Sequence, residues 1–233
     1  MTRTLYDTDL AWIHHAGFSE FAESAAPGIL AILAKRGVSN GTIVDAGCGS
    51  GVLSHAFTKA GYDTIGFDAS AAMIALARET APGASFFVAG FADAALPSCD
   101  AIVAVGEVLN YATLAETKRF ITNARTALRP GGMLLFDIAE SGSYPLHDER
   151  RIGGDDWSVI VIKDSDGRHL TRRVLTFREV GGEVRRSEEI HTLELYDRAE
   201  IVRLLRTAGF RVDVRRSYGT RRLPKGHAVY VSF

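Results

Sequence analysis

The sequence predicts a single α/β domain whose parallel β-sheet is covered by helices on both faces. Between residues 42 and 139, short apolar runs alternate with segments of helical periodicity. Continuous apolar runs are typical of strands buried on both faces of a parallel sheet. After residue 150, alternating strands are separated by turn signals, which predicts an inserted antiparallel meander. We therefore expect one domain over residues 1–233, with a doubly wound, mostly parallel, seven-stranded sheet.

Residues 1 to about 40 are predicted to be helical and to form a lid over the core. The second helix of this segment is expected over residues 25–36. Proline favours the first turn of a helix, so we expect a break at Pro27. Gly37 is expected to end this helix.

The alternating core is predicted to contain five strands and three helices. The strands are expected over residues 42–46, 63–68, 86–88, 101–105 and 133–138. The helices are expected over residues 50–60, 70–80 and 113–128, with glycine or proline at or after each end.

The remaining chain is predicted to form the meander and then to return to the main sheet. Meander strands are expected over residues 157–163, 171–178 and 185–195, followed by a capped helix over 197–209 and closing strands over 210–214 and 228–233. On the third meander strand, alternation places Glu189 and His191 on the same face as Leu193. That face could turn inward as the wall of a pocket, but we favour an exposed sheet with cross-strand ion pairs.

Composition narrows the class of partner. The chain has 27 Lys and Arg against 28 Asp and Glu, a net charge of −1, which lacks the basic footprint of a nucleic-acid or anionic-membrane binder. No apolar run approaches the roughly 18 residues of a membrane span. Two cysteines, Cys48 and Cys99, without a secretory signal predict reduced thiols in a cytoplasmic protein. The histidines have no zinc-like spacing, so no metal is expected.

The strongest motif is the glycine-rich turn after the first core strand, Val44 to Gly51. Such a turn lets the backbone approach a ligand and presents helix N-terminal amides to it. Asp68 ends the next strand, 21 positions after Gly47. Its carboxylate can accept hydrogen bonds from both hydroxyls of a ribose. The alternative is that Asp68 only caps the following helix, although Ser70 is the better cap.

The turn and three later segments together resemble class I S-adenosylmethionine-dependent methyltransferases. Asp45 to Gly51 resembles the first motif of the family, and Gly66 to Asp68 resembles its ribose-binding motif. Residues 100–107 resemble the fourth strand, and residues 128–137 resemble the turn into the fifth. The resemblance implies the Rossmann-like methyltransferase fold and S-adenosylmethionine as the cofactor.

The resemblance also implies roles for individual residues. Backbone contacts to the methionine part are implied at Ala46, Gly47 and Gly49, with Asp45 organising the loop and facing the cofactor amine. Asp68 would hold the ribose, Ala69 and Met73 would flank the adenosine, and Gly106 and Glu107 would lie near the sulfonium. Many relatives carry an Asp after the third strand, where this chain has Gly90-Phe91-Ala92. Adenine would therefore rest on Phe91 and on backbone hydrogen bonds, with Asp93 available only if the loop shifts.

In methyl transfer from a sulfonium, the protein mainly positions the two reactants and excludes water. A general base is needed only if the acceptor arrives protonated. Glu107, Asn110 and Tyr111 follow the fourth strand, where open α/β sheets bind ligands. The predicted lid adds Tyr6, His14 and His15, and the meander adds His191. The catalytic candidates are Tyr111, Glu107, His191 and His15, with a structural role open for each.

We conclude from the sequence that the chain transfers a methyl group from S-adenosylmethionine to a small-molecule acceptor. One alternative is a noncatalytic protein that binds S-adenosylmethionine or S-adenosylhomocysteine. A nicotinamide-dependent oxidoreductase is disfavoured, because the last position of the dinucleotide fingerprint falls on Val52. A nucleic-acid methyltransferase is disfavoured by the neutral charge. The meander could also offer an edge for a homodimer.

Overall fold

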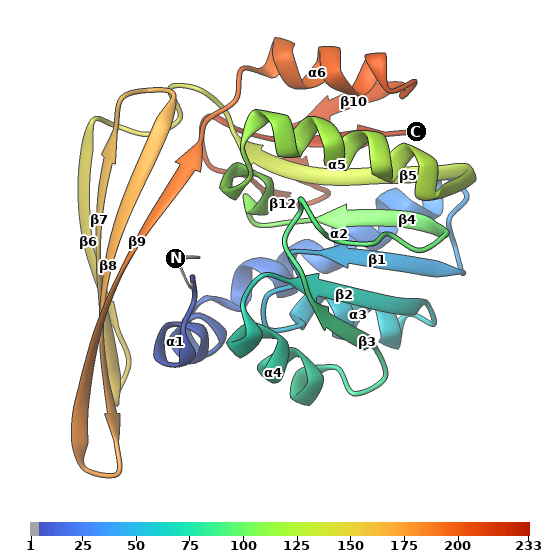
Figure 1. The fold of residues 1–233 in the computed structure, drawn as a ribbon. Coiled ribbons are helices and arrows are strands. Elements are labelled where there is room, and N and C mark those ends of the chain that lie inside the picture. The colour runs from blue at the N-terminus through green and yellow to red at the C-terminus, as the bar shows by residue number, and fades with distance from the viewer. Residues whose placement is uncertain (1–4) are drawn as a thin grey trace.

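A seven-stranded sheet forms the centre of the computed structural model, which describes residues 5–233 (Figure 1). Its strand order is β10-β13-β5-β4-β1-β2-β3. Six strands run parallel, and β13 alone is antiparallel to its two neighbours. The bounds are β1 Thr42–Ala46, β2 Asp63–Asp68, β3 Ser85–Val88, β4 Cys99–Ala104, β5 Leu128–Ala139, β10 Val212–Arg215 and β13 His227–Ser232. The predicted doubly wound sheet is confirmed.

Helices cover both faces of this sheet. Alternate side chains of each strand point to opposite faces, so Ile43 packs in one layer and Val44 in the other. The Ile43 layer includes α2 and α3, whereas the Val44 layer includes α5 and α6. The helix bounds are α1 Thr8–Phe18, α2 Glu20–Lys35, α3 Val52–Lys59, α4 Ala71–Thr80, η1 Val108–Tyr111 (a 3₁₀ turn), α5 Leu114–Ala127 and α6 Arg198–Thr207. Among residues 5–233, we find no helix long and apolar enough to cross a membrane.

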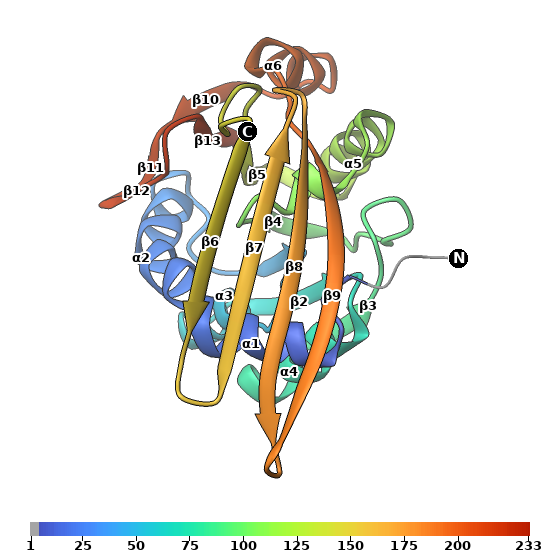
Figure 2. The ribbon, with the colours of Figure 1, turned by 90° about the vertical axis from the view of Figure 1, so that its left-hand side faces the viewer.

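The meander is a separate antiparallel sheet that stands beside the carboxyl ends of the parallel strands, with α1 lying between its lower part and the core (Figures 1 and 2). It contains β6 His147–Gly153, β7 Trp157–Ser165, β8 His169–Val180 and β9 Glu183–Glu194. Strand β6 was not predicted. Its charged sequence lacks apolar alternation because it is an edge strand that pairs only with β7. A short hairpin of β11 Ser217–Tyr218 and β12 Arg221–Arg222 was also not predicted.

The predicted break at Pro27 is wrong, because α2 begins at Glu20 and continues through the proline. Pro27 and Glu23, whose carbonyl loses its helical partner, are both exposed, so water can satisfy that carbonyl. The opposite face of α2 is buried against the sheet. Tertiary packing therefore outweighs the local preference for a break. The predicted lid began at residue 1, and residues 1–4 lie outside the described part of the chain.

Two other predicted boundaries need correction. Asp197 precedes α6, but its side chain accepts no capping hydrogen bond, and its carboxylate lies 3.7 Å from Arg168 instead. Strand β5 begins at Leu128, because a bulge lets this residue pair with Cys99 before the regular ladder starts. By contrast, Ser70 caps α4 by accepting from the amide of Met73 at 3.1 Å, as predicted.

Candidate functional site

The glycine-rich turn between β1 and α3 is tied to the neighbouring strand β2. The amide of Gly47 donates to the carbonyl of Phe67 at 2.8 Å. Gly47, Gly49 and Gly51 have φ angles of 70°, 51° and 81°, in the left-handed region that favours glycine. A residue with a side chain at any of these three positions would therefore strain the backbone of the turn.

Two glycines at this edge of the sheet face open space. No atom lies within 4 Å of where a Cβ would stand on Gly49 or on Gly106. By contrast, a Cβ on Gly47 would lie 2.9 Å from the Cβ of Val108, so that glycine serves close packing. The open space beside Gly49 and Gly106 fits a ligand that lies directly against the backbone, as S-adenosylmethionine would.

Asp68 stands at the end of β2 beside the turn. One carboxylate oxygen accepts from the amide of Gly49 at 3.0 Å, and the other accepts from the amide of Ser70 at 2.8 Å. Burial raises the pKa of Asp68 above its ordinary value, although these amide hydrogen bonds oppose the shift. The carboxylate is thus fixed in orientation at the predicted ribose position.

Asp45 lies one strand away and is 1% exposed. Its carboxyl accepts a hydrogen bond from the Ser54 hydroxyl at 2.6 Å. Burial raises the pKa of Asp45 to about 7, partly opposed by Ser54. The Asp45 side chain thus links the end of β1 to α3.

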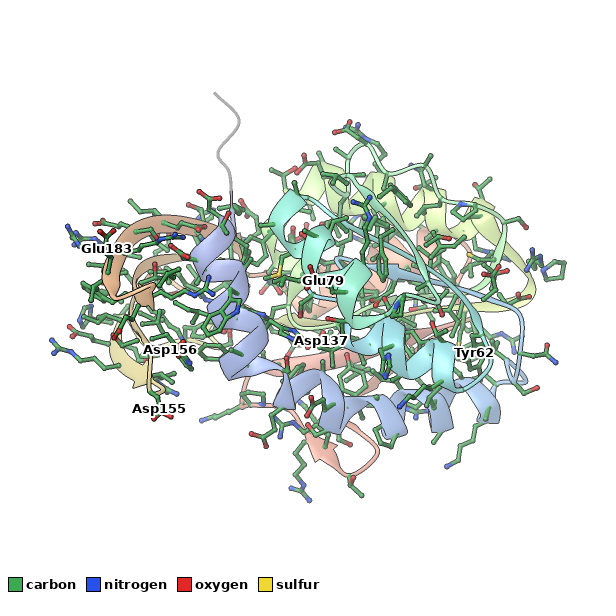
Figure 3. All side chains as sticks on the ribbon, turned by 90° about the horizontal axis from the view of Figure 1, so that it is seen from below. Tyr62, Glu79, Asp137, Asp155, Asp156 and Glu183 are labelled. Carbon is green, nitrogen blue, oxygen red and sulfur yellow. The ribbon has the colours of Figure 1, made fainter. Side chains whose placement is uncertain are left out.

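A strained turn follows β4 at Gly106 and Glu107. Glu107 has φ 61°, a left-handed conformation that is uncommon for a residue with a side chain. The Asp137 carboxyl holds this turn by accepting from the amide of Gly106 at 2.7 Å. Figure 3 shows Asp137 towards the middle of the molecule, far from the meander turns marked by Asp156 and Glu183.

Asp137 should make stability depend on pH. Burial raises its pKa to about 7, with a further contribution from the charge of Glu107. The unfolded chain loses this proton near pH 3.9, so the folded state binds more protons between these values and stability falls as pH rises. This titration should lower the unfolding free energy of the wild type by about 2 kcal/mol between pH 5 and 7. In Asp137→Asn, whose amide oxygen can still accept from Gly106, we expect this decrease to disappear. Urea denaturation at both pH values measures this, with exposed Asp63→Asn as the unchanged control.

The Glu107 side chain is the centre of a buried cluster that joins the core to the meander. Its carboxylate contacts Arg172 Nη2 at 2.5 Å, His227 Nε2 at 2.7 Å and the Tyr144 hydroxyl at 3.0 Å. Burial alone would raise the pKa of Glu107, but the Arg172 charge and the His227 hydrogen bond outweigh it and hold the pKa far below its usual range. For His227, burial lowers the pKa, and the hydrogen bond and charge of Glu107 raise it to a net value above the ordinary one. Glu107 therefore stays ionised beside a cationic Arg172.

A second buried chain of polar groups runs from the N-terminal segment to the meander. The Tyr6 and Tyr111 hydroxyls lie 3.1 Å apart, and Tyr111 lies 3.1 Å from His191 Nδ1. His191 Nε2 contacts Glu189 Oε2 at 2.9 Å, and the same oxygen accepts from the backbone amide of Tyr6 at 2.7 Å. Our preference for an exposed meander face is wrong, because His191 is 1% exposed and this face turns inward over the core. The structure therefore brings Tyr111 and His191 together.

The other predicted site residues are distributed around this centre. His15 contacts the Ser50 hydroxyl at 2.9 Å and thus ties α1 to the glycine turn, apart from Tyr111 and His191. His14 lies near Tyr6, and burial lowers its pKa to about 4, so its ring is neutral at pH 7. Asn110 is fully buried and clamps β5 to β9 by accepting from the Ala139 amide and donating to the Glu194 carbonyl, a structural role.

The residues predicted to flank the adenosine differ in exposure. Ala69 is exposed beside Asp68, whereas Met73 is only 2% exposed. Phe91 is half-buried and meets Phe67 and Phe120 edge to face, so one part of its ring belongs to the core. Ala46 is fully buried at the end of β1.

Sequence reasoning missed Arg172, Tyr144 and His227, which complete the Glu107 cluster. Tyr144 and His227 lie 37 and 120 positions from Glu107, and no motif joins them. Arg172 did carry a signal. It occupies an inward position of β8 between buried Leu170 and Val174, where alternation calls for an apolar residue.

Comparison with known proteins agrees with this geometry. Residues 43–132 match a family model described as a methyltransferase domain. The structure of S-adenosylmethionine-bound CalS10, an amino pentose methyltransferase from Micromonospora echinaspora, shares the fold with a TM-score of 0.76, 20% identity and coverage of 100% of both chains.

Two curated relatives align with different parts of the chain. The chain is 24% identical over 228 residues to dTDP-3-amino-3,4,6-trideoxy-alpha-D-glucopyranose N,N-dimethyltransferase of Streptomyces venezuelae, covering 90% of this chain and 93% of the relative. It is 33% identical over 99 residues to a ubiquinone biosynthesis O-methyltransferase of Sinorhizobium fredii, covering 40% and 38%. The family match, the fold and the glycine turn agree. Residues 43–132 form a methyltransferase domain, and the chain is an enzyme that transfers the methyl group of S-adenosylmethionine to a small-molecule acceptor.

Proposed function

We propose that the acceptor is an amine of a small molecule, of the amino-sugar class. The observation that carries this proposal is the buried chain from Tyr111 through His191 to Glu189. An amine arrives largely protonated at neutral pH, so it must lose a proton before its nitrogen can attack. The relative that aligns over 90% of the chain, and CalS10, are described as aminosugar or amino pentose methyltransferases, which supports the same class.

The proposed cofactor site consists of the glycine turn and the Asp68 carboxylate, with Gly106 and Glu107 at the methionine end. S-adenosylmethionine supplies an activated methyl group for in-line displacement. The glycine amides and Asp68 fix its position, and α1 covers this edge through the His15–Ser50 contact. Asp45 and Asp137 act as positioning residues. Asp45 accepts from the Ser54 hydroxyl on α3, and Asp137 accepts from the amide of Gly106 in the turn after β4.

The proposed proton route uses the Tyr111 hydroxyl and the His191 imidazole. Burial raises the pKa of Tyr111, so its hydroxyl keeps its proton until a neighbour accepts it. An acceptor ammonium that replaces Tyr6 at this hydroxyl can give a proton to Tyr111 Oη while Tyr111 gives its own to His191 Nδ1. The imidazolium that results is stabilised by Glu189 at Nε2. The acceptor nitrogen is then free to take the methyl group.

The relay predicts the effect of removing its members. We expect Tyr111→Phe and His191→Asn each to lower kcat/KM for an amino-sugar acceptor by about 10²-fold at pH 7, with a smaller loss at pH 9, where more of the amine is already neutral. Release of S-adenosylhomocysteine and mass spectrometry of the acceptor measure this over a panel of amino sugars and phenols. Tyr62→Phe is the control. This buried tyrosine donates to the Val38 carbonyl and lies far from the meander (Figure 3).

Three outcomes would count against the amine proposal. Methylation of phenols without amines would contradict it and favour the O-methyltransferase chemistry described for the Sinorhizobium relative. An equal loss of activity at pH 7 and pH 9 would contradict the proton relay. A loss of affinity for S-adenosylhomocysteine in these variants would assign Tyr111 and His191 to cofactor binding instead.

We also propose that the meander forms a homodimer through its outer face. Inward residues of β7, β8 and β9 are buried, so alternation places Ile160, Leu175, Phe177 and Ile190 on the opposite, partly exposed face. Arg and Glu side chains of both signs surround them, as a self-complementary two-fold contact requires. We expect Leu175→Glu to convert a dimer to a monomer in sedimentation equilibrium. Val88→Glu, on the far edge of the main sheet, should leave the dimer intact, and a monomeric wild type would refute the proposal.

A cytoplasmic location is proposed from the two thiols. Cys48 and Cys99 are free and buried, and burial raises the pKa of both, that of Cys99 to about 12. Unpaired thiols suit a reducing compartment. Cell fractionation tests this location, and recovery from an oxidising compartment would contradict it.

A further inference from the structure

The Tyr6 ring lies between the meander and the turn that follows β4. Its centroid is 5.3 Å from that of His14, with the two rings edge to face, and 5.0 Å from that of His191. The Tyr111 ring borders it at 6.3 Å. Residues of three separate elements, α1, η1 and β9, therefore surround one aromatic ring. We call the position bounded by His14, Tyr111 and His191 the Tyr6 seat.

The hydroxyl of Tyr6 meets the atom to which the proposed relay brings the acceptor. It lies 3.1 Å from the Tyr111 hydroxyl, which in turn lies 3.1 Å from His191 Nδ1. Burial raises the pKa of Tyr6 well above its ordinary value, so this phenol stays neutral. A ring that carries a neutral hydroxyl thus fills the place to which the reacting group of the acceptor must come. Tyr6 and the acceptor therefore exclude each other.

The backbone of Tyr6 is held in a strained conformation. Its φ is 54°, and in the described residues 5–233 only Glu107 is a second residue other than glycine with a positive φ. A left-handed backbone is unfavourable for a bulky side chain and persists only where the surroundings impose it. Here Glu189 accepts from the Tyr6 amide at 2.7 Å, and the Ser70 hydroxyl donates to the Tyr6 carbonyl at 2.7 Å. Departure of the ring from its seat would relieve this strain.

Glu189 links the position of Tyr6 to the relay. Its Oε2 accepts from the Tyr6 amide and also contacts His191 Nε2 at 2.9 Å. When Tyr6 leaves the seat and its backbone relaxes, Oε2 loses the amide and keeps His191. The carboxylate then stabilises the imidazolium of the relay more strongly, because one donor fewer shares its charge.

We propose that Tyr6 is an internal competitor of the methyl acceptor, which fills the acceptor site of the free enzyme and swings out when the acceptor binds. This inference rests on the proposed function and adds a displacement step before it. Tyr6 precedes Asp7, the N-cap of α1, so it can leave while α1 stays packed on the meander through Leu10. A seated Tyr6 also keeps water away from the acceptor side of the cofactor when no acceptor is present.

The first test is calorimetric titration with p-cresol, which has the structure of a tyrosine side chain, of enzyme saturated with S-adenosylhomocysteine. We expect Tyr6→Ala to bind p-cresol saturably and at least about tenfold more tightly than the wild type, because an emptied cavity takes up a small ligand of its own shape. Tyr6→Phe keeps the ring in the seat and should behave like the wild type.

Trp12→Ala is the control for a general loosening of α1. It removes the contact of the Trp12 ring with Arg178, whose Cζ lies 3.8 Å from the ring centroid, and leaves the Tyr6 seat filled. It should bind p-cresol no better than the wild type. The proposal is overturned if Tyr6→Ala binds S-adenosylhomocysteine normally but p-cresol not at all, or if Trp12→Ala binds p-cresol equally well.

The second test compares KM for the best acceptor in the panel of amino sugars and phenols. The apparent affinity of a ligand falls with the fraction of enzyme whose site is open, so loss of the competitor in Tyr6→Ala should lower KM at least about tenfold. In this variant p-cresol should inhibit competitively against the acceptor. An unchanged or higher KM would show that Tyr6 is a fixed wall of the pocket, which contradicts the proposal.

The outcomes are separate from those of the proposed function. If phenols and not amines are methylated, the amine proposal fails, but the KM comparison is made with the phenol and still decides the role of Tyr6. If Tyr6→Ala does not fold, the wild type labelled with fluorotyrosine gives the answer by ¹⁹F NMR, with the Tyr6 resonance assigned by its absence in Tyr6→Phe. Saturating acceptor should move this resonance to the position of an exposed tyrosine, and a resonance that stays in place would overturn the proposal.

Discussion

Arg172→Leu is expected to lower the unfolding free energy by about 3–5 kcal/mol, because it leaves the Glu107 carboxylate buried without its cation. Arg172 and Glu107 are 16% and 17% exposed at their side chains, and they meet at 2.5 Å. Of the remaining partners, Tyr144 is uncharged, and His227, whose pKa Glu107 raises, titrates and is not a permanent cation. Urea denaturation at pH 7 measures the loss.

The double variant Arg172→Leu/Glu107→Gln is the decisive comparison. Removing both charges should restore much of the stability, since the desolvation penalty of the unpaired carboxylate disappears with it. Arg173→Leu is the matched control on the same strand. Its partner Glu188 is exposed, and an exposed pair contributes only about 0–1 kcal/mol. Similar losses for Arg172→Leu and Arg173→Leu would show that the buried Glu107–Arg172 pair contributes no more to stability than an exposed ion pair.

The parallel core could be predicted from the sequence because each of its signals is local. The strand Asp63–Asp68 is apolar in its interior, and Gly61 precedes it. Ser70 stands where helix α4 needs a cap and accepts from Met73. The glycine turn and Asp68 occupy fixed positions relative to these elements, so the candidate cofactor site followed from the same signals.

The acceptor side could not be predicted in the same way, because distant residues build it. Glu189 and His191 alternate with apolar residues, but the pattern alone does not say which face of the meander turns inward. The inward face is instead fixed by contacts with distant residues. Tyr6 contacts Glu189 from 183 positions away, and Tyr111 contacts His191 from 80 positions away. Pro27 failed as a signal for the same reason, since packing of α2 on the sheet outweighs the local preference.

Asp68→Ala is expected to weaken the binding of S-adenosylhomocysteine by about 10- to 100-fold, measured by calorimetry. A carboxylate that accepts from a ribose contributes about 1.5–3 kcal/mol through charged hydrogen bonds. The carboxylate also holds the amide of Gly49 at 3.0 Å, so its loss loosens the turn that lies against the cofactor. Asp68→Asn should lose less affinity, because the amide oxygen can still accept one hydrogen bond.

The control for Asp68 is Asp63→Ala, which removes an exposed carboxylate at the opposite end of β2. Its affinity for S-adenosylhomocysteine should equal that of the wild type, and NAD should bind none of these proteins. Since Gly49 borders open space, Gly49→Val should abolish binding without any change in charge. If Gly49→Val abolishes binding but Asp68→Ala leaves it intact, the cofactor lies on the turn and Asp68 only braces it. If neither variant matters, the cofactor binds elsewhere and the proposed site is wrong.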